Sequence, residues 1–378
     1  MRIGLVAGEA SGDVLGAGLI RAIRSRCPDA TFEGVAGPAM VEAGCAQWEP
    51  AETLAVMGFV EPIRHIPRLL GLRRDLVRRW TQSRPAVVVG IDAPDFNLGL
   101  ETKLRRAGVR TAHFVSPTIW AWRPGRVKTV KKAADRVLCI FPFEPAIYAE
   151  HGVDAVFVGH PRADETPEVV DTAAARSKLG IEAGAVVAVM PGSRRSEIQR
   201  LGQTFAQAAR LVSERRPGTR FVTPIATAVL RPAIERHLRD AGVIDDFILL
   251  DGQSQLALTA ADVAMQASGT AVLEAALLRK PAVAAYRVAA LSWLIGKGLR
   301  LVRLTHYTMP NFLTEEPLVP EFIQGDARPG PISDAVVALL DDPQRRRFIG
   351  RSFDRLRNEL ALDSGQHAAE AIIELARR

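Results

Sequence analysis

Short apolar runs alternate along most of the chain with longer segments in which apolar residues recur at helical spacing. Continuous runs of Val, Ile, Leu and Ala are typical of strands buried on both faces, as in parallel sheets covered by helices. Helical spacing is clearest over residues 14–23, 63–80 and 198–212. The alternation predicts the α/β class with parallel sheets. The predicted strands are residues 3–7, 31–35, 87–91, 111–115, 136–140, 154–158, 185–190, 220–224, 247–250, 263–266 and 282–286.

The alternation is interrupted over residues 159–175, where Pro, Thr and acidic residues replace the apolar pattern. A chain of 378 residues exceeds one ordinary hydrophobic core, so two domains are expected. We therefore predict one Rossmann-like, doubly wound domain over residues 1–165 and a second over residues 166–349. The last segment, residues 350–378, is expected to form a helix that packs back on the first domain.

The composition limits the kind of protein this can be and the kinds of partner it can bind. A content of 48% hydrophobic and 24% charged residues is typical of a globular chain with a well-buried core. The formal net charge of +7 suits a nucleic acid, an anionic membrane or a phosphorylated substrate without choosing among them. Cys27, Cys45 and Cys139 lack metal-ligand spacing and are typical of reduced thiols in a cytoplasmic protein. Neither a signal peptide nor a membrane-spanning run is predicted, so any membrane contact is expected to be peripheral.

A candidate phosphate site lies in the second domain at MPGSRRSE, residues 190–197, between a predicted strand and a predicted helix. Gly192 would let a phosphate approach closely, and the Ser193 N–H group at the helix start would favour an anion. Arg194 or Arg195 could add a guanidinium. An ordinary strand-to-helix turn with surface arginines explains the same residues equally well.

A second strand, turn and helix pattern follows in the same domain. Ser268, Gly269 and Thr270 could offer N–H groups and hydroxyls to another phosphate. Glu274, one helical turn later, could accept hydrogen bonds from a ribose, although acids near helix starts commonly complement the helix dipole. Asn311, in a predicted loop, could read a sugar or base with its amide, or serve as an ordinary turn residue.

Polar residues follow three predicted strands of the first domain. Glu9 follows the first strand, together with Ser11 and Gly12, while Asp92 and Ser116 follow two later strands. Because ligands bind at the carboxyl ends of parallel strands, these residues could converge on one crevice. The glycines of this first turn do not form a GxGxxG fingerprint, so no dinucleotide is inferred.

Two further segments could meet a ligand or a membrane. Residues 56–60 are apolar, and the helical segment after them mixes leucines with arginines, as in helices that lie on anionic membranes. A packed helix with a solvated basic face is the equally weighted alternative. Trp120 and Trp122 could stack on a ring or an acyl chain, or pack in the core. The basic residues 123–132 suggest nucleic acid, but no base-reading motif accompanies them.

Seven motifs occur in order and together cover most of the chain. They are GEASGD (8–13), VMGFVE (56–61), GIDAPDFN (90–97), VSPTIWAWR (115–123), PGSRRSE (191–197), ASGTAVLE (267–274) and MPN (309–311). In this combination the sequence closely resembles the lipid-A-disaccharide synthase family, whose members are glycosyltransferases of the GT-B fold. That fold consists of two doubly wound Rossmann-like domains with a cleft between them.

The resemblance implies an inverting transfer of 2,3-diacylglucosamine from UDP-2,3-diacylglucosamine to 2,3-diacylglucosamine 1-phosphate, called lipid X. The products are a β-1,6-linked lipid A disaccharide 1-phosphate and UDP, with no cofactor and no metal. The first domain would bind the acceptor and the second the UDP-sugar. The enzyme would be cytoplasmic and bound peripherally to the cytoplasmic face of the inner membrane. It would bind no nucleic acid, and it could form a homodimer. The alternative is another GT-B enzyme acting on a UDP-sugar, such as an epimerase or a soluble-acceptor transferase.

For this reaction Asp92 is the predicted general base, with Glu9 and Asp95 as the competing carboxylates. Arg194 and the N–H groups at Ser193 and residues 268–270 would stabilise charge on the leaving diphosphate in place of a metal. The predicted substrate and UDP contacts are Ser11, Gly12, Ser116, Trp120, Gly192, Ser193, Arg194, Ser268, Gly269, Thr270, Glu274 and Asn311.

Overall fold

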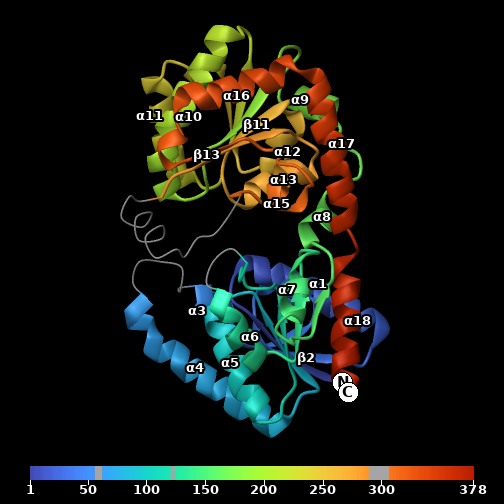
Figure 1. Cartoon of the computed structure of the whole chain (residues 1–378). Helices are drawn as coiled ribbons and strands as arrows, with labels where there is room; N and C mark the ends of the chain where they lie inside the picture. The colour runs from blue at the N-terminus through green and yellow to red at the C-terminus, as the bar shows by residue number, and fades with distance from the viewer. Residues whose placement is uncertain (56–61, 121–123, 289–305) are drawn as a thin grey trace. The chain divides into compact units, whose positions relative to one another are not determined.

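The computed structural model describes residues 1–55, 62–120, 124–288 and 306–378. The chain divides into two compact units, each built from one sheet and its helices (Figure 1). Unit 1 comprises Met1–Asp164 and Leu360–Arg378, and unit 2 comprises Glu165–Glu359. The segment that belongs to unit 1 at the C-terminus therefore begins at Leu360, later than the predicted residue 350.

Unit 1 contains a seven-stranded sheet in the order β3-β2-β1-β4-β5-β6-β7. All neighbouring strands in it pair in parallel. The order reverses between β1 and β4, so the helices that follow these two strands, α1 (Ala10–Arg26) and α5 (Pro94–Arg106), cover opposite faces of the sheet. Doubly wound sheets bind ligands at such a switch point. The strands are β1 (Arg2–Ala7), β2 (Thr31–Ala36), β3 (Cys45–Pro50), β4 (Val87–Ile91), β5 (Thr111–Phe114), β6 (Arg136–Cys139) and β7 (Ala155–Phe157).

Helices cover both faces of this sheet because successive side chains of a strand point to opposite faces. Ile3 and Leu5 of β1 lie in one buried cluster with α1 and α18, whereas Val6 lies in another with α4 and α5. The helical elements are α1 (Ala10–Arg26), α2 (Pro38–Glu42), α3 (Glu52–Ala55), α4 (Pro62–Ser83), α5 (Pro94–Arg106), η2 (Pro124–Arg126), α6 (Val127–Ala133), α7 (Glu144–Ala149), α8 (Pro161–Glu165) and α18 (Ser364–Arg377).

The C-terminal helix α18 is held to unit 1 by packing and by charge. Its apolar side chains share the buried cluster of α1. Arg136 of β6 donates to the Ala371 carbonyl at 3.1 Å and to Glu374 Oε2 at 2.8 Å. Hydrogen bonds from Arg136 and Arg378 lower the pKa of Glu374 to about 2. The last helix is thus a structural part of the first sheet domain.

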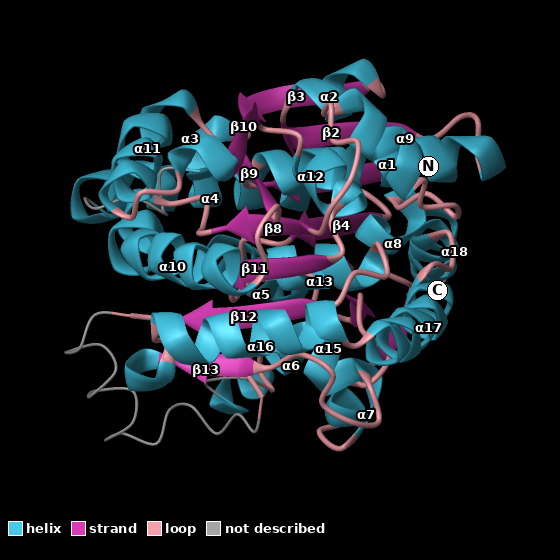
Figure 2. Cartoon of the chain, turned by 90° about the horizontal axis from the view of Figure 1, so that it is seen from above, coloured by secondary structure: helices cyan, strands magenta, loops and turns pink. Residues whose placement is uncertain are grey.

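Unit 2 contains a six-stranded parallel sheet in the order β10-β9-β8-β11-β12-β13, and Figure 2 shows its strands in this sequence. The order reverses between β8 and β11, which pair directly with each other. The loops after β8 and β11 therefore mark the switch point of this sheet. The strands are β8 (Val186–Met190), β9 (Arg220–Ile225), β10 (Phe247–Asp251), β11 (Val263–Ala267), β12 (Ala282–Tyr286) and β13 (Glu321–Ile323).

Helices again lie on both faces of the second sheet, so its central strands are almost wholly buried. The first long helix, α10, follows the MPGSRRSE turn as predicted. The helical elements are α9 (Thr172–Lys178), α10 (Arg195–Arg215), η3 (Ala228–Leu230), α11 (Arg231–Asp240), η4 (Ile244–Asp246), α12 (Ser254–Ala260), α13 (Thr270–Leu277), α15 (Met309–Leu313), η5 (Gln324–Asp326), α16 (Pro329–Asp341) and α17 (Pro343–Leu360).

The apolar runs correctly predicted the central strands, with ends that differ by a residue or two. They missed β3 and β13, which lie at sheet edges. An edge strand has a neighbour on one side only and can keep polar residues, and most of β3 is only partly buried or exposed. The predicted loop around Asn311 was also wrong, because Met309–Leu313 forms the short helix α15.

Candidate functional site

The loops after β1 and β4 meet at the switch point of unit 1. A Cβ atom on Gly8 would lie 2.7 Å from the Cβ of Ala93, so only glycine allows the two loops to approach this closely. Glu9 is the N-cap of α1 and is exposed, while Asp92 is partly exposed. Two of the three carboxylates predicted as the base therefore lie on adjoining loops.

The turn that carries Asp92 is strained. Asp92 and Ala93 have φ angles of +52° and +41°, in a region that residues with side chains rarely adopt. Buried Asn97 supports this turn, since its Nδ2 donates to the Asp92 carbonyl at 2.8 Å. Strained backbone persists where its surroundings hold it, and it concentrates at functional sites. Asn97 stands in the GIDAPDFN motif, but its residue type alone did not predict this role.

Asp95 differs from the other two carboxylates. It lies in the first turn of α5, and its exposed carboxylate forms an ion pair with Arg126. Arg73 of α4 donates to the Asp95 carbonyl at 3.2 Å. Because the Asp95 carboxylate is already paired with Arg126, this geometry favours Asp92 and Glu9 as the carboxylates that could meet a substrate hydroxyl.

The first turn of α1 carries two predicted contacts and one residue that the sequence analysis missed. Ser11 is exposed, and Gly12 is buried beside Ile91. Asp13 is buried and accepts hydrogen bonds from the backbone N–H groups of three residues of the β2–α2 turn. The acid of GEASGD therefore caps α2 and holds the turn after β2 against α1. The N–H groups that donate to Asp13 belong to Gly37, Ala39 and Met40.

Ser116 is buried instead of facing a ligand, which corrects the prediction of direct substrate contact. Its Oγ lies 2.9 Å from the Tyr148 hydroxyl oxygen. Glu144, at the start of α7, accepts from Phe141 N at 3.1 Å and from Trp120 Nε1 at 3.4 Å. Burial raises the pKa of Glu144 to about 7. The segment after β5 is thus anchored to a buried carboxylate. Of the two residues in it predicted to contact a substrate, Ser116 is buried and Trp120 is partly exposed.

In the predicted phosphate turn of unit 2, the carboxylate of Glu197 already accepts hydrogen bonds from the backbone. Gly192 has a φ angle of +128°, and a Cβ there would lie 2.4 Å from the Cβ of Glu197. Glu197 Oε2 accepts from Ser193 N at 2.9 Å and from Arg194 N at 3.1 Å. The prediction that the Ser193 N–H points freely at a phosphate is therefore wrong, because a carboxylate already occupies it. The Arg194 side chain is exposed.

The turn after β11 adjoins this phosphate turn. Gln266 Nε2 donates to Met190 Sδ at 3.0 Å, which links the ends of β11 and β8. Ser268 donates its N–H to the Ala285 carbonyl and its hydroxyl to the Tyr307 carbonyl. Both donors of Ser268 are therefore used within the fold.

The remaining predicted contacts of this turn lie at the start of α13. Gly269 is its N-cap and Thr270 its first residue. Glu274 lies one turn later and is partly exposed. A helix start of this kind leaves N–H groups that favour an anion.

The side-chain amide of Asn311, predicted to contact a sugar or base, makes its hydrogen bonds inside unit 2. Its Nδ2 donates to the Val319 carbonyl at 2.8 Å and to Glu321 Oε1 at 3.0 Å. Its Oδ1 accepts from Leu318 N and Val319 N at 2.8 and 2.9 Å. An amide has two donors and two acceptor positions, so nothing is left for a ligand.

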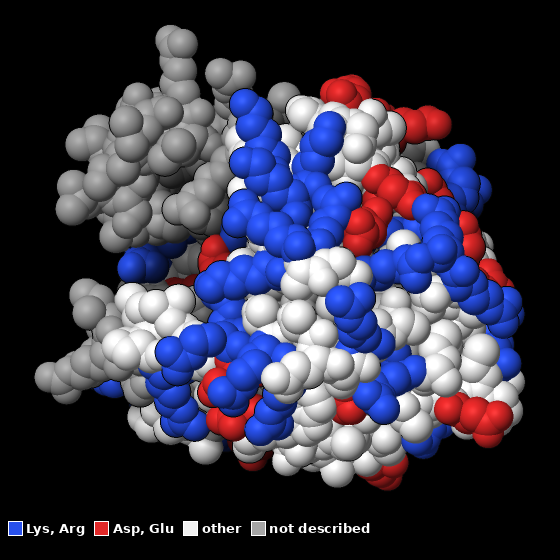
Figure 3. Space-filling model, turned by 90° about the horizontal axis from the view of Figure 1, so that it is seen from below, with Lys and Arg blue, Asp and Glu red and all other residues white. Residues whose placement is uncertain are grey.

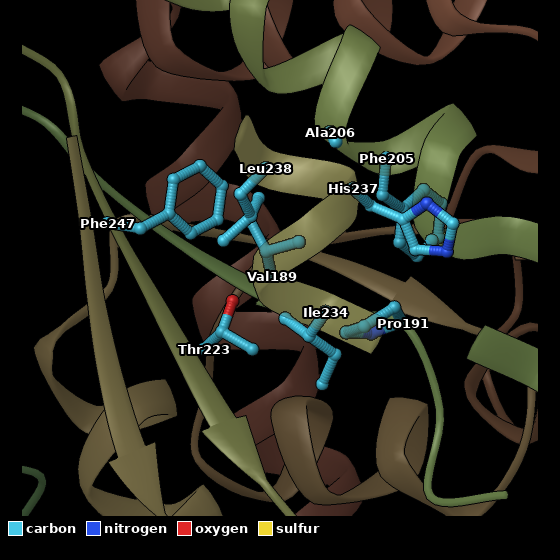
Figure 4. A pocket seen from close by; sticks show the side chains of 10 residues that line it. Val189, Pro191, Phe205, Ala206, Thr223, Ile234, His237, Leu238 and Phe247 are labelled. Carbon is cyan, nitrogen blue, oxygen red and sulfur yellow. The ribbon is translucent and has the colours of Figure 1, made fainter. Parts of the chain in front are cut away.

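A small cavity lies behind the phosphate turn, between β8, β9, β10, α10 and α11 (Figure 4). Its volume is about 10 Å³, and Pro191, which precedes Gly192, forms part of its wall. A space of this size holds at most one water molecule, so it is a packing void and not a substrate site.

Some apolar side chains of helix α4 are buried in the core of unit 1, and others are exposed. Leu69, Leu76 and Trp80 are buried, whereas Ile66 and Leu70 are 45% and 51% exposed. Many Lys and Arg side chains gather on the face of the molecule seen in Figure 3.

Two arginines of the predicted basic face of α4 lie over aromatic rings, although Arg79 stays exposed and Arg73 partly exposed. Arg73 lies over Phe96 at 4.9 Å and Arg79 over Trp48 at 5.1 Å. The apolar residues 56–60 predicted to meet acyl chains, and Trp122, lie outside the described residues.

The described parts of the chain are residues 1–55, 62–120, 124–288 and 306–378. Within those ranges no helix is long and apolar enough to cross a bilayer. Within the same ranges no group of three or more His, Cys, Asp or Glu side chains is arranged to hold a metal ion.

Solved structures with the same fold include proteins that act on or bind nucleotide sugars. The UDP-GlcNAc 2-epimerase from Neisseria meningitidis, bound to UDP-GlcNAc, matches with a TM-score of 0.61 and 12% identity, covering 99% of both chains. MurG from Acinetobacter baumannii matches with the same TM-score, 12% identity and 99% coverage of both chains. At this identity the likeness concerns the fold alone, which is the GT-B type with two Rossmann-like domains.

Sequence relatives are much more similar. The lipid-A-disaccharide synthase of Alkalilimnicola ehrlichii is 47% identical over 379 aligned positions, which cover 100% of this chain and 99% of the relative. The enzyme of the same name from Pseudomonas aeruginosa is 48% identical, with 100% and 99% coverage. The family model described as lipid-A-disaccharide synthetase matches residues 3–374. The chain therefore belongs to the lipid-A-disaccharide synthetase family.

Proposed function

We propose that this protein is a glycosyltransferase that makes the lipid A disaccharide. It transfers 2,3-diacylglucosamine from UDP-2,3-diacylglucosamine to the 6-hydroxyl of lipid X, with inversion, and releases UDP. The observation that carries the proposal is the family match over residues 3–374, together with relatives about half identical over nearly their whole length. The UDP-sugar ligand named for a solved structure of the same fold supports the donor class.

Unit 1 is proposed to bind the acceptor and to supply the general base. Asp92 is the first candidate because it stands at the switch point, on a strained turn that Asn97 supports. Glu9 is the second, since its loop adjoins that turn through Gly8 and Ala93. A base that takes the proton of the attacking hydroxyl contributes about 10²- to 10⁴-fold to the rate. Asp95 becomes the weakest candidate because Arg126 holds it.

Unit 2 is proposed to bind the UDP group. Arg194 is exposed beside the glycine turn, and its guanidinium would stabilise charge that grows on the leaving diphosphate. The start of α13, at Gly269 and Thr270, would hold phosphate oxygens, and Glu274 would accept hydrogen bonds from the ribose. Ser193, Ser268 and Asn311 are left out of this proposal because the chain itself uses their hydrogen-bonding groups.

The test is an assay of the purified protein with the two diacyl substrates, scored for disaccharide and for UDP in equal amounts. Incubation with the donor alone is the control, because an epimerase would isomerise a UDP-sugar without an acceptor. Disaccharide formed only when both substrates are present supports the proposal. Isomerised donor without disaccharide would replace it with the epimerase alternative.

We also propose that unit 1 docks on an anionic membrane through α4, because both proposed lipid substrates carry acyl chains. Residues four apart lie on one face of a helix, and Ile66, Leu70, Arg74 and Arg78 form such an exposed stripe. The stripe is apolar at its start and basic towards its end, which suits an interface between acyl chains and anionic headgroups.

Liposome sedimentation tests this docking. Each arginine near an anionic surface is worth about 1 kcal/mol, so replacing both Arg74 and Arg78 by Ser should weaken binding roughly 30-fold at low salt. Replacing Ile66 and Leu70 by Ser should weaken it at every salt concentration. A matched control replaces two exposed arginines of unit 2, Arg210 and Arg239. If all three variants sediment like the unmodified protein, α4 is an ordinary packed helix.

A further inference from the structure

A buried hydrogen-bond network lies at the carboxyl ends of β5 and β6, one strand beyond the turn that carries Asp92. Its centre is the carboxyl group of Glu144, which is 1% exposed. Phe141 N–H and the Trp120 indole N–H donate to it at 3.1 and 3.4 Å. The Ser116 hydroxyl lies 2.9 Å from the hydroxyl oxygen of Tyr148, which belongs to the same helix as Glu144. Helix α7 therefore holds both ends of the segment from Ser116 to Trp120, through Tyr148 at one end and Glu144 at the other.

The backbone before this segment is strained in a way that requires such an anchor. Val115 has a φ angle of +74°, which is a genuine outlier for a β-branched residue. Strain of this kind costs on the order of 1–3 kcal/mol and persists only where neighbouring groups over-determine the conformation. The bonds of Ser116 and Trp120 to the Glu144 network supply that constraint immediately after the strained residue.

Within the described residues, the side-chain contacts of Glu144 are hydrogen bonds from uncharged donors, the Phe141 N–H and the Trp120 indole N–H. Burial is the main reason that its pKa rises to about 7, and the bonds from Phe141, Ser116 and Trp120 act in the opposite direction. The titratable neighbours are Cys139 of β6 and Tyr148 of α7, and burial raises the pKa of both. Both stay neutral near pH 7, so Glu144 is the member of this cluster that changes charge there.

Trp120 is the member of the segment that reaches the surface. Its ring is partly exposed and packs edge-to-face on Phe143, with centroids 5.3 Å apart. An indole fixed at its N–H and along one edge presents its remaining surface in a defined orientation. Apolar rings of this kind stack on sugar rings and on acyl chains.

We propose that Glu144 is a positioning residue for the acceptor: it holds the Ser116–Trp120 segment so that the Trp120 ring contacts the diacylated sugar that attacks the donor. The inference rests on the proposed function for the identity of the acceptor. It assigns no chemical step to Glu144, which touches neither reacting group. Nothing in the GEASGD or GIDAPDFN motifs points to this residue, because it belongs to the turn after β6.

The carboxylate form is the one that accepts the Trp120 N–H most strongly. Protonation as the pH falls through about 7 removes the charge and weakens that bond. Trp120 should therefore be held best above pH 7 and released below it. The Michaelis constant for the acceptor should rise as the pH falls, while turnover at saturating acceptor should change little.

The test compares the unmodified protein with Glu144→Gln and Tyr148→Phe. Gln keeps the shape but cannot ionise, and its amide donors face the N–H groups that the carboxylate accepted. Its acceptor Michaelis constant should be about tenfold higher at alkaline pH, the factor expected for losing one hydrogen bond to a charged group. It should also lose the pH dependence that the unmodified protein shows around pH 7. Tyr148→Phe removes only the hydroxyl that contacts Ser116, so it should keep the pH dependence with a smaller rise.

Tryptophan fluorescence supplies a readout that needs no substrate. The chain has five tryptophans, so the Trp120 signal is the difference between a protein and its Trp120→Phe version. That difference should change with pH around a midpoint near 7 in the unmodified protein, and it should not change with pH in Glu144→Gln. Thermal unfolding of both proteins is the control that shows that they are folded. A titration that persists in Glu144→Gln, or an acceptor Michaelis constant unchanged in that variant, would overturn the proposal. If no disaccharide forms with any version, the proposed function fails, and the fluorescence titration still decides whether Glu144 positions Trp120.

Discussion

Replacing Asp13 should destabilise unit 1 through the turn that follows β2. Asp13 accepts the N–H groups of Gly37 at 2.9 Å, Ala39 at 2.9 Å and Met40 at 3.0 Å. The bonds to Gly37 and Met40 are buried, whereas that to Ala39 is only partly buried. In Asp13→Ala two buried donors lose their acceptor and water can reach only the third.

The size of the effect follows from these two donors. A buried donor left without a partner costs about 1–3 kcal/mol, so the pair predicts a loss of roughly 2–6 kcal/mol in the free energy of unfolding. Asp13→Asn should lose less, because its remaining oxygen can still accept from Gly37 and Met40 while its amide faces Ala39. The expected order of stability is therefore the unmodified protein, then Asp13→Asn, then Asp13→Ala.

Denaturant unfolding followed by the fluorescence of Trp48 and Trp80 measures this loss in unit 1. Their rings lie 5.4 Å apart beside the same sheet, so they report on this unit. Hydrogen exchange of a peptide spanning residues 31–42 should show the local opening directly. Asp29→Ala removes an exposed acid of the same unit and should stay within about 0.5 kcal/mol. A loss below about 0.5 kcal/mol in Asp13→Ala would refute the reasoning.

Four further outcomes are expected. Asp92→Asn should keep the fold and UDP affinity but lose roughly two or more orders of magnitude in turnover, and activity within severalfold would move the base to Glu9. Arg194→Ala and Glu274→Gln should each weaken UDP binding in calorimetry, and unchanged affinity in both would reject the proposed UDP site. Disaccharide formation should survive EDTA, and activity lost to EDTA and restored by magnesium would show that the reaction uses a metal. Arg136→Met should lower the unfolding midpoint at neutral pH by freeing α18, as followed by urea denaturation.

The pH dependence of that last variant has a definite sign. The folded pKa of Glu374 is lowered to about 2, so its contribution to stability is present above the unfolded pKa of about 4.3 and is lost as the pH falls towards 2. The difference in urea midpoint between Arg136→Met and the unmodified protein should therefore shrink between about pH 5 and about pH 2. A constant difference across this window would show that Arg136 acts through packing alone.

The local pattern of the sequence determined the two-sheet architecture and the places where ligands meet it. Strands such as Val87–Ile91 are recognisable because a strand buried on both faces is a continuous apolar run. Asp92 could be placed at a strand end for the same reason, since the apolar run stops there. The capping of α10 by Glu197 could also be predicted from local sequence, because an acid three residues after a helix N-cap is a known signature of helix capping.

Only the tertiary structure decided which of the polar residues remain available to a ligand. Ser116 meets Tyr148, Ser268 meets the carbonyl of Tyr307, and Asn311 meets Glu321. None of these partners follows from local spacing, because each is brought close by the packing of separate elements. A sequence shows how many hydrogen bonds a side chain can make, whereas the folded chain determines how many of them it has already used. Polar groups inside a folded protein are almost always hydrogen-bonded, and the partners of Ser116, Ser268 and Asn311 are other groups of the same chain.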